Sequence, residues 1–596
     1  MEQRHLADMI AQSCRRHADQ VAMRYKSDGA WQAITYGELG GRIQRIAAAL
    51  TAMGVRAGDR VGIFSQNCAE WAIADFGILT VDAVTVPIYA TNTAGQAEYI
   101  VRDAGLKVIF VGDGAQYAKV TSFADRHGLL DHIIRFDTPD TSVEDGNRTQ
   151  TFSDLLASSS SHDDAPRPAR PASDTSRHLA SIIYTSGTTG DPKGVMLSHG
   201  SFFHQIDAVN TYFQVSPEDR SLCFLPLSHV FERSWSYCVF HQGAQNHYIP
   251  SPRDVLPAMV EVKPTAMVSV PRLYEKIHAA IMDRLEKAPP LRRRLFEWAI
   301  AVGRQRADAR RADRKPGGGL VLKHWLADRL VLRKIRDIVG GDKNFFSAGG
   351  APLAKEIEDF FLDVGLLICQ GYGLTETAPM ITCNTPRHFK FGTVGRPVPG
   401  CQVRIGPSEE VQVKGPNVML GYYNNPTATA AAFDDGWFRT GDVGRIDRDG
   451  FLVITDRIKD LIITSGGKNI APQHIETAVG KDHYIEQIAT IGDRRKYVSA
   501  LIVPSFEAVE SLAREKGIAF RSREELVKHP EIIRFFRERI DQQSGELAGF
   551  ETIKTFTLLP REFSQEEGEV TPTQKIRRKV VAQQFAAEID AMYPEK

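Results

Sequence analysis

Long apolar runs, paired cysteines and an excess of either charge are all missing from this 596-residue chain. No stretch of about 18 uninterrupted apolar residues occurs, so we expect no membrane span. The first ten residues, MEQRHLADMI, have no apolar core of the signal-peptide type. The seven cysteines are odd in number, scattered and free of CxxC pairs, which argues against a disulfide framework or a zinc knuckle. We therefore expect a cytoplasmic chain in a reducing compartment.

The charges balance over the whole chain, with 73 Lys and Arg residues against 73 Asp and Glu residues. No global field draws such a protein to nucleic acid, so we expect no nucleic-acid partner. A composition of 42% hydrophobic and 24% charged residues is ordinary for a globular protein. The length exceeds what one hydrophobic core can organise and predicts roughly two to four domains.

One stretch, residues 287–336, departs from this balance and is called the basic insert below. It holds fifteen Lys and Arg residues against four acids, a net charge of +11. Its apolar positions favour amphipathic helices, and two interpretations stay open. The charges meet water or nearby acids on a packed helical insert, or the insert makes reversible contact with an anionic membrane surface. These apolar positions include Leu295, Trp298, Ile300, Val302, Leu322, Trp325, Leu326 and Leu330.

Short β-branched runs alternate with amphipathic stretches through the first two-thirds of the chain, as in VGIFS (61–65) followed by EWAIADFGIL (70–79). This alternation is typical of βαβ units on mostly parallel sheets. Residues 157–176, rich in Ser, Pro and Asp, indicate a loop or connector. Short strands and turns dominate from about 392 to 456, and a smaller α+β pattern follows from 459.

The segment YTSGTTGDPKG (184–194) directly follows an apolar strand-like run. Its glycines let the backbone approach a ligand, and its hydroxyls, amides and lysine suit a polyphosphate. A plain polar turn is the alternative, and the spacing does not match a Walker A loop. The candidate phosphate-binding residues are Thr185, Ser186, Gly187, Thr188, Thr189, Gly190 and Lys193.

This segment resembles the phosphate-binding loop of the adenylate-forming (AMP-binding) superfamily, and four further family motifs follow in order. They are QGYGLTET (370–377), WFRTGD (437–442), DRIKDLIITSGGKNI (456–470) and TPTQKIRR (571–578). The resemblance covers nearly the whole chain and implies an α/β fold. A large N-terminal domain (1–458), with two α/β subdomains and a β-rich subdomain, would precede a small mobile α+β domain (459–596) with a hinge at Lys459.

The resemblance also implies roles for individual residues. Lys575 would lie between a substrate carboxylate and the α-phosphate of ATP, where charge concentrates during adenylation. Thr375 would donate to that phosphate, and Glu376 would hold Mg²⁺. Taken alone, Lys575 would be a solvated cation in a basic tail, and Glu376 an ordinary surface acid.

Further positions would bind the nucleotide and a thiol substrate. Asp442 would accept from the ribose hydroxyls, Arg457 would donate to ribose or phosphate, and Tyr372 would lie against the purine. The remaining lining residues are Gly349, Gly350, Ala351, Gly371 and Gly373 for the nucleotide, and Ser465, Gly466 and Gly467 for the pantetheine arm of coenzyme A. The implied substrates and cofactors are therefore ATP, Mg²⁺ and coenzyme A.

LPLSHVFER (225–233) and VPRLYEKI (270–277) resemble the long-chain fatty acyl-CoA synthetase branch. This implies ligation of a medium-to-long-chain fatty acid to coenzyme A through an acyl-adenylate. A ligase for an aromatic or short-chain acid, an adenylate-only enzyme and a catalytically dead binding protein are the alternatives. His229 is a candidate for the acyl site or an ordinary core histidine. Arg233 stands where some relatives carry a gating tryptophan, so such a gate is not favoured.

Overall fold

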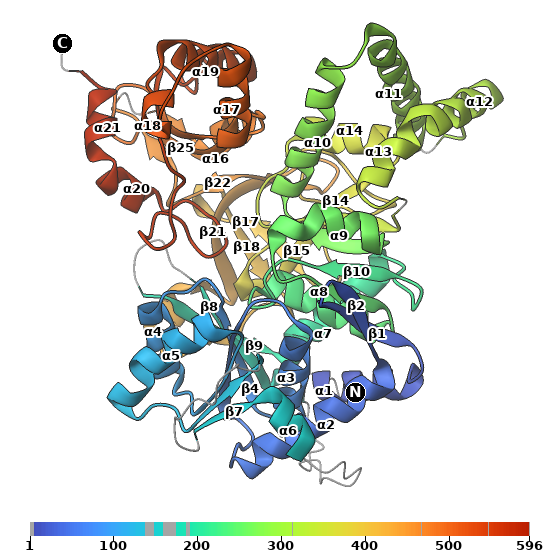
Figure 1. Cartoon of the computed structure of the whole chain (residues 1–596), viewed down its shortest axis with the longest axis vertical. Coiled ribbons are helices and arrows are strands. Elements are labelled where there is room, and N and C mark those ends of the chain that lie inside the picture. The colour runs from blue at the N-terminus through green and yellow to red at the C-terminus, as the bar shows by residue number, and fades with distance from the viewer. Residues whose placement is uncertain are drawn as a thin grey trace.

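The structure is a computed structural model of the chain. It places a large N-terminal part below a smaller C-terminal part that sits at one corner (Figure 1). Residues 159–174 of the expected connector lie outside the described part of the chain. The described residues are 5–137, 148–158, 175–185, 191–312, 314–341, 343–465, 468–545 and 547–594.

The largest sheet has eight strands in the order β19-β9-β8-β4-β3-β5-β6-β7. Strands β8, β4, β3, β5, β6 and β7 run parallel, while β9 pairs antiparallel with both of its neighbours, β8 and β19. The predicted alternation of strands and helices is confirmed, because helices connect the parallel neighbours. The elements are α1 (Leu6–Arg16), α2 (Tyr36–Ala52), β3 (Arg60–Ser65), α3 (Ala69–Thr80), β4 (Val84–Tyr89), α4 (Ala94–Ala104), β5 (Val108–Val111), α5 (Gly114–His127), β6 (His132–Arg135), β7 (Thr149–Thr151), α6 (Phe152–Ser158), η1 (Thr175–Arg177), β8 (Leu179–Thr185), β9 (Lys193–Ser198), α7 (His199–Tyr212) and β19 (Gly421–Tyr422).

Local sequence signals set the ends of these helices. Helix α4 begins with a capping box, in which the Thr93 hydroxyl accepts from the Gln96 amide and the Gln96 side chain accepts from the Thr93 amide. It ends at Gly105, whose φ of 63° lies in the left-handed region that favours glycine.

Two further sheets complete the α/β part, in the orders β12-β13-β14-β15-β16 and β10-β11-β1-β2. In the first, β12, β13 and β14 run parallel and β15 and β16 turn back antiparallel. Their elements are β1 (Val21–Ser27), β2 (Ala30–Thr35), β10 (Arg220–Cys223), α8 (Val230–His241), β11 (Gln245–Tyr248), η2 (Pro252–Asp254), α9 (Val255–Val262), β12 (Ala266–Ser269), α10 (Pro271–Glu286), β13 (Phe345–Ala348), α14 (Lys355–Asp363), β14 (Ile368–Gly373), η4 (Thr375–Thr377), β15 (Met380–Cys383) and β16 (Arg396–Pro397).

The basic insert is helical and projects away from the rest of the chain at the upper right of Figure 1. Helix α11 packs on α14 through its small residues. A Cβ atom on Gly303 would lie 2.0 Å from the carbonyl oxygen of Asp363, so only glycine permits this approach. The insert comprises α11 (Pro290–Arg311), α12 (Gly318–Ala327), η3 (Asp328–Leu332) and α13 (Arg333–Ile338).

A small sheet, β17-β18-β21-β20 with β22 paired to β21, lies between the α/β part and the C-terminal part. The C-terminal part has its own hydrophobic core, drawn from residues 462–592. Their elements are β17 (Gln402–Ile405), η5 (Pro407–Glu409), β18 (Glu410–Lys414), α15 (Pro426–Ala431), β20 (Phe433–Asp434), β21 (Trp437–Ile446), β22 (Leu452–Arg457), β23 (Ile462–Ile463), β24 (Asn469–Ile470), α16 (Pro472–Gly480), β25 (Ile485–Ile491), β26 (Ser499–Pro504), α17 (Phe506–Glu515), α18 (Arg523–Leu526), α19 (Pro530–Gln543), β27 (Thr555–Leu558), α20 (Arg578–Gln584) and α21 (Ala586–Ala591).

All seven cysteines are free thiols, and six of them are buried. Among the described residues, no helix combines the length and the apolar character that crossing a bilayer requires.

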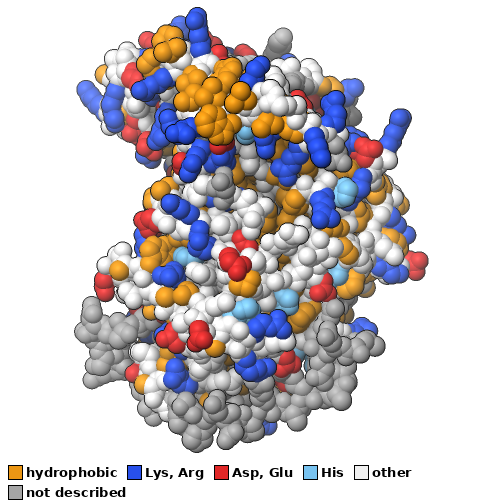
Figure 2. Space-filling model, turned by 90° about the vertical axis from the view of Figure 1, so that its right-hand side faces the viewer, with side chains coloured by type: hydrophobic (Ala, Val, Ile, Leu, Met, Phe, Trp, Pro, Cys, Tyr) orange, Lys and Arg blue, Asp and Glu red, His pale blue; other side chains and the backbone are white. Residues whose placement is uncertain are grey.

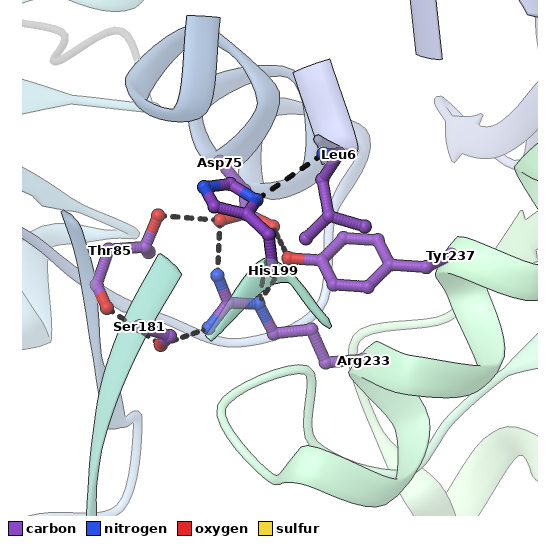
Figure 3. A network of polar contacts seen from close by, with 7 residues as sticks. All are labelled: Leu6, Asp75, Thr85, Ser181, His199, Arg233 and Tyr237. Atoms are coloured by element: carbon purple, nitrogen blue, oxygen red, sulfur yellow. Dashed lines mark hydrogen bonds and ion pairs between the residues drawn. The ribbon is translucent and has the colours of Figure 1, made fainter. Parts of the chain in front are cut away.

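A buried ion pair ties α8 and α3 to the strand that leads into the predicted phosphate loop (Figure 3). The guanidinium of Arg233 lies 2.5 Å from the carboxylate of Asp75, and each side chain is 1% exposed. Arg233 also donates to the hydroxyl of Ser181 on β8, at 2.6 Å. Tyr237 and Thr85 each donate to Asp75, at 2.7 Å. The pair is therefore surrounded by partners that offset its desolvation.

Because Arg233 is held by these contacts, its side chain is not available to act as a movable gate. The tryptophan two residues further on is also a core residue. Trp235 is 3% exposed, and its indole N–H donates to the hydroxyl of Ser221 at 2.8 Å.

We predict that Arg233→Met destabilises the N-terminal part by about 3–5 kcal/mol, because it leaves the Asp75 carboxylate buried without its cation. Urea unfolding followed by tryptophan fluorescence measures the change, and Trp71, whose ring lies 5.4 Å from the guanidinium, contributes to the signal. Arg514→Met is the matched control, because Arg514 is exposed and pairs with Glu510 at 3.6 Å on the surface. Equal unfolding midpoints for the two variants would contradict the prediction.

Candidate active site

The predicted phosphate loop connects two antiparallel strands, β8 and β9. Thr185 and Lys193 form a cross-strand pair at their ends and so mark both edges of the loop. Ser186, Gly187, Thr188, Thr189 and Gly190 lie outside the described residues.

Lys193 is connected to the predicted magnesium ligand through a residue that no motif identified. The ammonium of Lys193 lies 4.9 Å from the ring centre of Tyr422. The hydroxyl of Tyr422 donates to the carboxylate of Glu376 at 2.9 Å. Tyr422 lies on β19, which joins the large sheet far from Glu376 in sequence, so only the fold brings these residues together.

The end of strand β14 presents Gly371, Tyr372 and Gly373. A Cβ atom on Gly373 would lie 1.7 Å from the carbonyl oxygen of Pro379, so this position requires glycine. The hydroxyl of Tyr372 donates to the carboxylate of Asp442 at 2.6 Å. The η4 turn that follows holds Thr375, which is buried, and Glu376, which is half-buried.

Asp442 and Arg457 face each other across the neighbouring strands β21 and β22. Their side chains lie 3.3 Å apart, and the Asp442 residue is only 4% exposed. Burial raises the pKa of Asp442, while Arg457 and the Tyr372 hydrogen bond act in the opposite direction. The carboxylate thus meets both a cation and a hydroxyl donor.

Lys575 lies in a turn of the C-terminal part, and contacts within that part stabilise the turn. The Lys575 amide donates to the Thr571 hydroxyl at 3.0 Å. Glu569, just before the turn, is fully buried and pairs with Arg561 at 2.7 Å. The Arg577 amide donates to the Glu569 carbonyl at 2.8 Å and closes the turn on its other side.

Charges of the N-terminal part act on Lys575. Crowding by surrounding protein and, second, the Arg457 charge lower the pKa of Lys575 to about 8, while Asp442 and Glu376 oppose the shift. The residue keeps an exposed surface, so the surroundings crowd it without enclosing it. Burial and the Lys575 charge lower the pKa of His229 to about 4, so this histidine is neutral at pH 7.

The predicted second nucleotide loop lies against the start of α8. Gly349 is buried and donates its amide to the carbonyl of Ser269 at 3.1 Å. A Cβ atom on Gly349 would lie 3.1 Å from the ring of Phe231, two residues after His229. Gly350 and Ala351, which follow, are exposed.

The expected hinge and the first expected coenzyme A residue, Lys459 and Ser465, follow strand β22 in the chain. Lys459 is exposed in a turn in which the amides of Asp460 and Leu461 donate to the Arg457 carbonyl, at 3.0 and 3.2 Å. Ser465 donates its amide to the Arg495 carbonyl at 2.9 Å, within the C-terminal part. Gly466 and Gly467 lie outside the described residues.

Comparison with known proteins gives a family for this site and fold. The AMP-binding enzyme model matches residues 10–423, and the AMP-binding enzyme C-terminal domain model matches residues 459–596. The long-chain-fatty-acid–CoA ligase FadD15 of Mycobacterium tuberculosis is 37% identical, over 99% of this chain and 97% of that protein. Long chain acyl-CoA synthetase 1 of Arabidopsis thaliana is 32% identical, over 94% of this chain and 87% of that protein.

Solved structures share the architecture. The adenylation domain of a carboxylate reductase from Mycobacterium chelonae aligns with a TM-score of 0.80 at 21% identity, covering all of this chain and 92% of that one. A fatty acyl CoA synthetase of Mycobacterium tuberculosis aligns with a TM-score of 0.62 at 22% identity, covering 98% and 99%. The expected fold, a large N-terminal domain followed by a small C-terminal domain, is confirmed. The chain belongs to the AMP-binding enzyme family.

Proposed function

We propose that the chain ligates a medium-to-long-chain fatty acid to coenzyme A through an enzyme-bound acyl-adenylate, with release of AMP and pyrophosphate. The observation that carries the proposal is that Lys575, from the C-terminal domain, lies within electrostatic range of Asp442, Arg457 and Glu376, whose charges act on its pKa. The names of the relatives that match over nearly the full chain support the fatty acid and coenzyme A as substrates.

The adenylation step joins two anions, because the substrate carboxylate attacks the α-phosphorus of ATP and expels pyrophosphate. A cation between the two lowers their repulsion and stabilises the charge of the transition state. Lys575 fits this role, since a pKa of about 8 keeps it mostly protonated at pH 7. His229, neutral and at the start of α8, fits a position beside the acyl group.

Asp442 and the residues that contact it are the proposed binding site for the nucleotide. Its carboxylate suits the two ribose hydroxyls, and Arg457 beside it suits ribose or phosphate oxygens. Tyr372, held at its hydroxyl by Asp442, would lie along the purine. The Thr185–Lys193 loop would surround the outer phosphates, with Thr375 donating to the α-phosphate.

Magnesium fits the donors at this site. The described residues contain no cluster of three His, Cys, Asp or Glu side chains that would form a protein-built cage. Mg²⁺ bound with ATP needs only one or two carboxylates, because phosphates and water supply the other ligands. One oxygen of Glu376 accepts from Tyr422, which leaves the second oxygen for the cation. Bound there, Mg²⁺ would neutralise phosphate charge during adenylation.

Lys459 is the proposed hinge for the second half-reaction. Rotation of the C-terminal domain about this turn would withdraw Lys575 and bring Ser465, Gly466 and Gly467 toward the acyl-adenylate, where they would line the path of the pantetheine arm. The chain runs from Lys459 directly into Asp460-Leu-Ile-Ile, without the insertion typical of adenylate-only relatives.

The test of the proposed function is AMP formation with a panel of acids from acetate to oleate, together with benzoates. We expect AMP formation to require coenzyme A and to be fastest with acids of medium or long chain. A maximum at acetate or benzoate would favour the alternative ligases. Acid-dependent pyrophosphate exchange without thioester formation would indicate an adenylate-only enzyme.

We predict that Lys575→Ala lowers acid-dependent ATP–pyrophosphate exchange by roughly 10²–10³-fold or more, because the cation at the transition state is lost. Thiolysis of pre-formed acyl-adenylate should be largely retained, since the lysine is withdrawn in that orientation. Lys579→Ala, an exposed lysine in the same segment, is the control. An equal loss in both half-reactions would argue against two domain orientations.

We also propose that the basic insert docks on the anionic inner face of the membrane. Part of its charge is neutralised within the protein, as in the pairs Arg304–Asp363 and Arg336–Asp328. Its outer helix nevertheless exposes large apolar side chains, with Leu322 at 68% and Trp325 at 56%. Figure 2, which views the molecule from the right-hand side of Figure 1, shows an apolar patch bordered by Lys and Arg side chains on its upper part. Exposed apolar residues ringed by cations are typical of reversible attachment to anionic lipid.

Vesicle co-sedimentation tests the docking surface. Leu322→Ser/Trp325→Ser should weaken binding to anionic vesicles at least about tenfold, because the apolar part of the contact is lost. Reversal of Arg292, Arg293 and Arg294 to Glu should weaken it too, and salt should weaken it further by screening. Ile405→Ser/Ile446→Ser, exposed apolar residues on the small sheet, is the matched control. If the unmodified protein ignores anionic vesicles at low salt, the insert is purely structural.

A further inference from the structure

One arginine of the N-terminal domain completes a helix end in the C-terminal domain. Arg272 lies in the first turn of α10, and one of its guanidinium nitrogens donates to the Gly480 carbonyl at 3.2 Å. The other donates to the carbonyls of Ile485 and Glu486, at 3.0 and 2.9 Å. Gly480 is the last residue of α16, where carbonyl groups have no partner within the helix and the dipole is negative. A cation from the opposite domain therefore satisfies the last carbonyl of this helix and complements the charge of its end.

Ion pairs flank this contact on both sides. The carboxylate of Glu486 lies 3.4 Å from Arg272 and 3.0 Å from Lys276, one turn further along α10. These two cations outweigh the effect of burial and lower the pKa of Glu486. On the other side, Lys481 of the C-terminal domain pairs with Glu356 of α14 at 2.7 Å. The complementary charges define one docking orientation.

This orientation is the one in which the charge of Lys575 acts on His229 and that of Asp442 acts on Lys575. The C-terminal domain has a separate core and follows the exposed turn at Lys459. Packing inside this domain therefore does not determine its orientation relative to the N-terminal domain. A rotation about that turn must break the contacts of Arg272 with α16 and β25. The free energy of these contacts is therefore part of the difference between the two orientations.

We propose that Arg272 is a positioning residue for adenylation, which holds the C-terminal domain by its α16 end so that Lys575 reaches the reacting groups. The inference rests on the proposed two-step ligation and extends it to the equilibrium between domain orientations. Arg272 contacts no substrate in this scheme and acts only through the domain that it holds. Lys276, Lys481 and their acidic partners support the same orientation.

The test replaces Arg272 with leucine, which keeps an apolar stem but removes the donors. Acid-dependent ATP–pyrophosphate exchange should fall at least about fivefold, as expected for loss of a conformational coupling. Thiolysis of supplied acyl-adenylate should stay unchanged or rise, because the competing orientation gains population. Arg272→Lys keeps the charge but not the planar fork of donors, so its exchange rate should lie between those of the unmodified protein and Arg272→Leu. Arg284→Leu, at an exposed position near the end of α10, is the matched control.

Domain orientation itself supplies a second readout. Spin labels at Lys107→Cys and Arg534→Cys, both exposed, report the distance between the two domains. Arg272→Leu should broaden or shift this distance distribution, and Arg284→Leu should leave it unchanged. If Arg272→Leu folds poorly, Glu486→Gln should produce the same shift with a smaller loss of exchange.

The outcomes separate this inference from the proposed function. Absence of acid-dependent exchange in the unmodified protein would overturn the function. Normal exchange in the unmodified protein, together with an Arg272→Leu variant that matches Arg284→Leu in rates and distances, would overturn the positioning role alone. A proportional loss of both half-reactions without a change in distance would also overturn it.

Discussion

A carboxylate that is almost completely buried organises the centre of this molecule. Removing an ionised group from water costs free energy unless partners compensate it, and Asp442 at 4% exposure obtains them from two other strands. Tyr372, at the end of β14, donates a hydrogen bond to Asp442, and Arg457, at the end of β22, pairs with it. The backbone carbonyl of Arg457 also accepts the hydrogen bonds of the turn at Lys459, so the residue that pairs with Asp442 lies where the chain passes into the C-terminal domain.

The second constraint is that Lys575, the cation proposed for adenylation, belongs to a domain with a hydrophobic core of its own. The turn that carries Lys575 is held within its own domain, because the buried Glu569 carboxylate pairs with Arg561 and the Lys575 amide donates to the Thr571 hydroxyl. Its position relative to Asp442 depends on contacts between domains, which include the three hydrogen bonds of Arg272. Rigid parts joined by a few polar contacts suit an enzyme that must present different groups to one intermediate in turn.

The sequence motifs predicted the family, the order of the domains and the basic, helical character of the insert. Local patterns succeed there because glycine spacing, hydroxyl clusters and strand–helix alternation are local properties. Tyr422 escaped prediction because β19 joins the large sheet from a distant part of the chain. Arg272 escaped for a related reason, since its partners depend on how two domains dock. The sequence predicted amphipathic helices throughout the insert, with apolar residues on one face and charged residues on the other. Val302 on α11 is buried because α11 packs on α14, whereas Leu322 and Trp325 on α12 are exposed.

The burial of the cysteines has a chemical consequence for an enzyme of this kind. An acyl-adenylate is an activated electrophile, and in the proposed reaction a thiolate from coenzyme A must be its acceptor. Burial raises the pKa of all seven thiols, to about 12 for Cys14, Cys383 and Cys401 and further for the others. Since the thiolate is the nucleophile, these side chains are poor competitors for the acyl group. The fold thereby protects the enzyme from acylating itself.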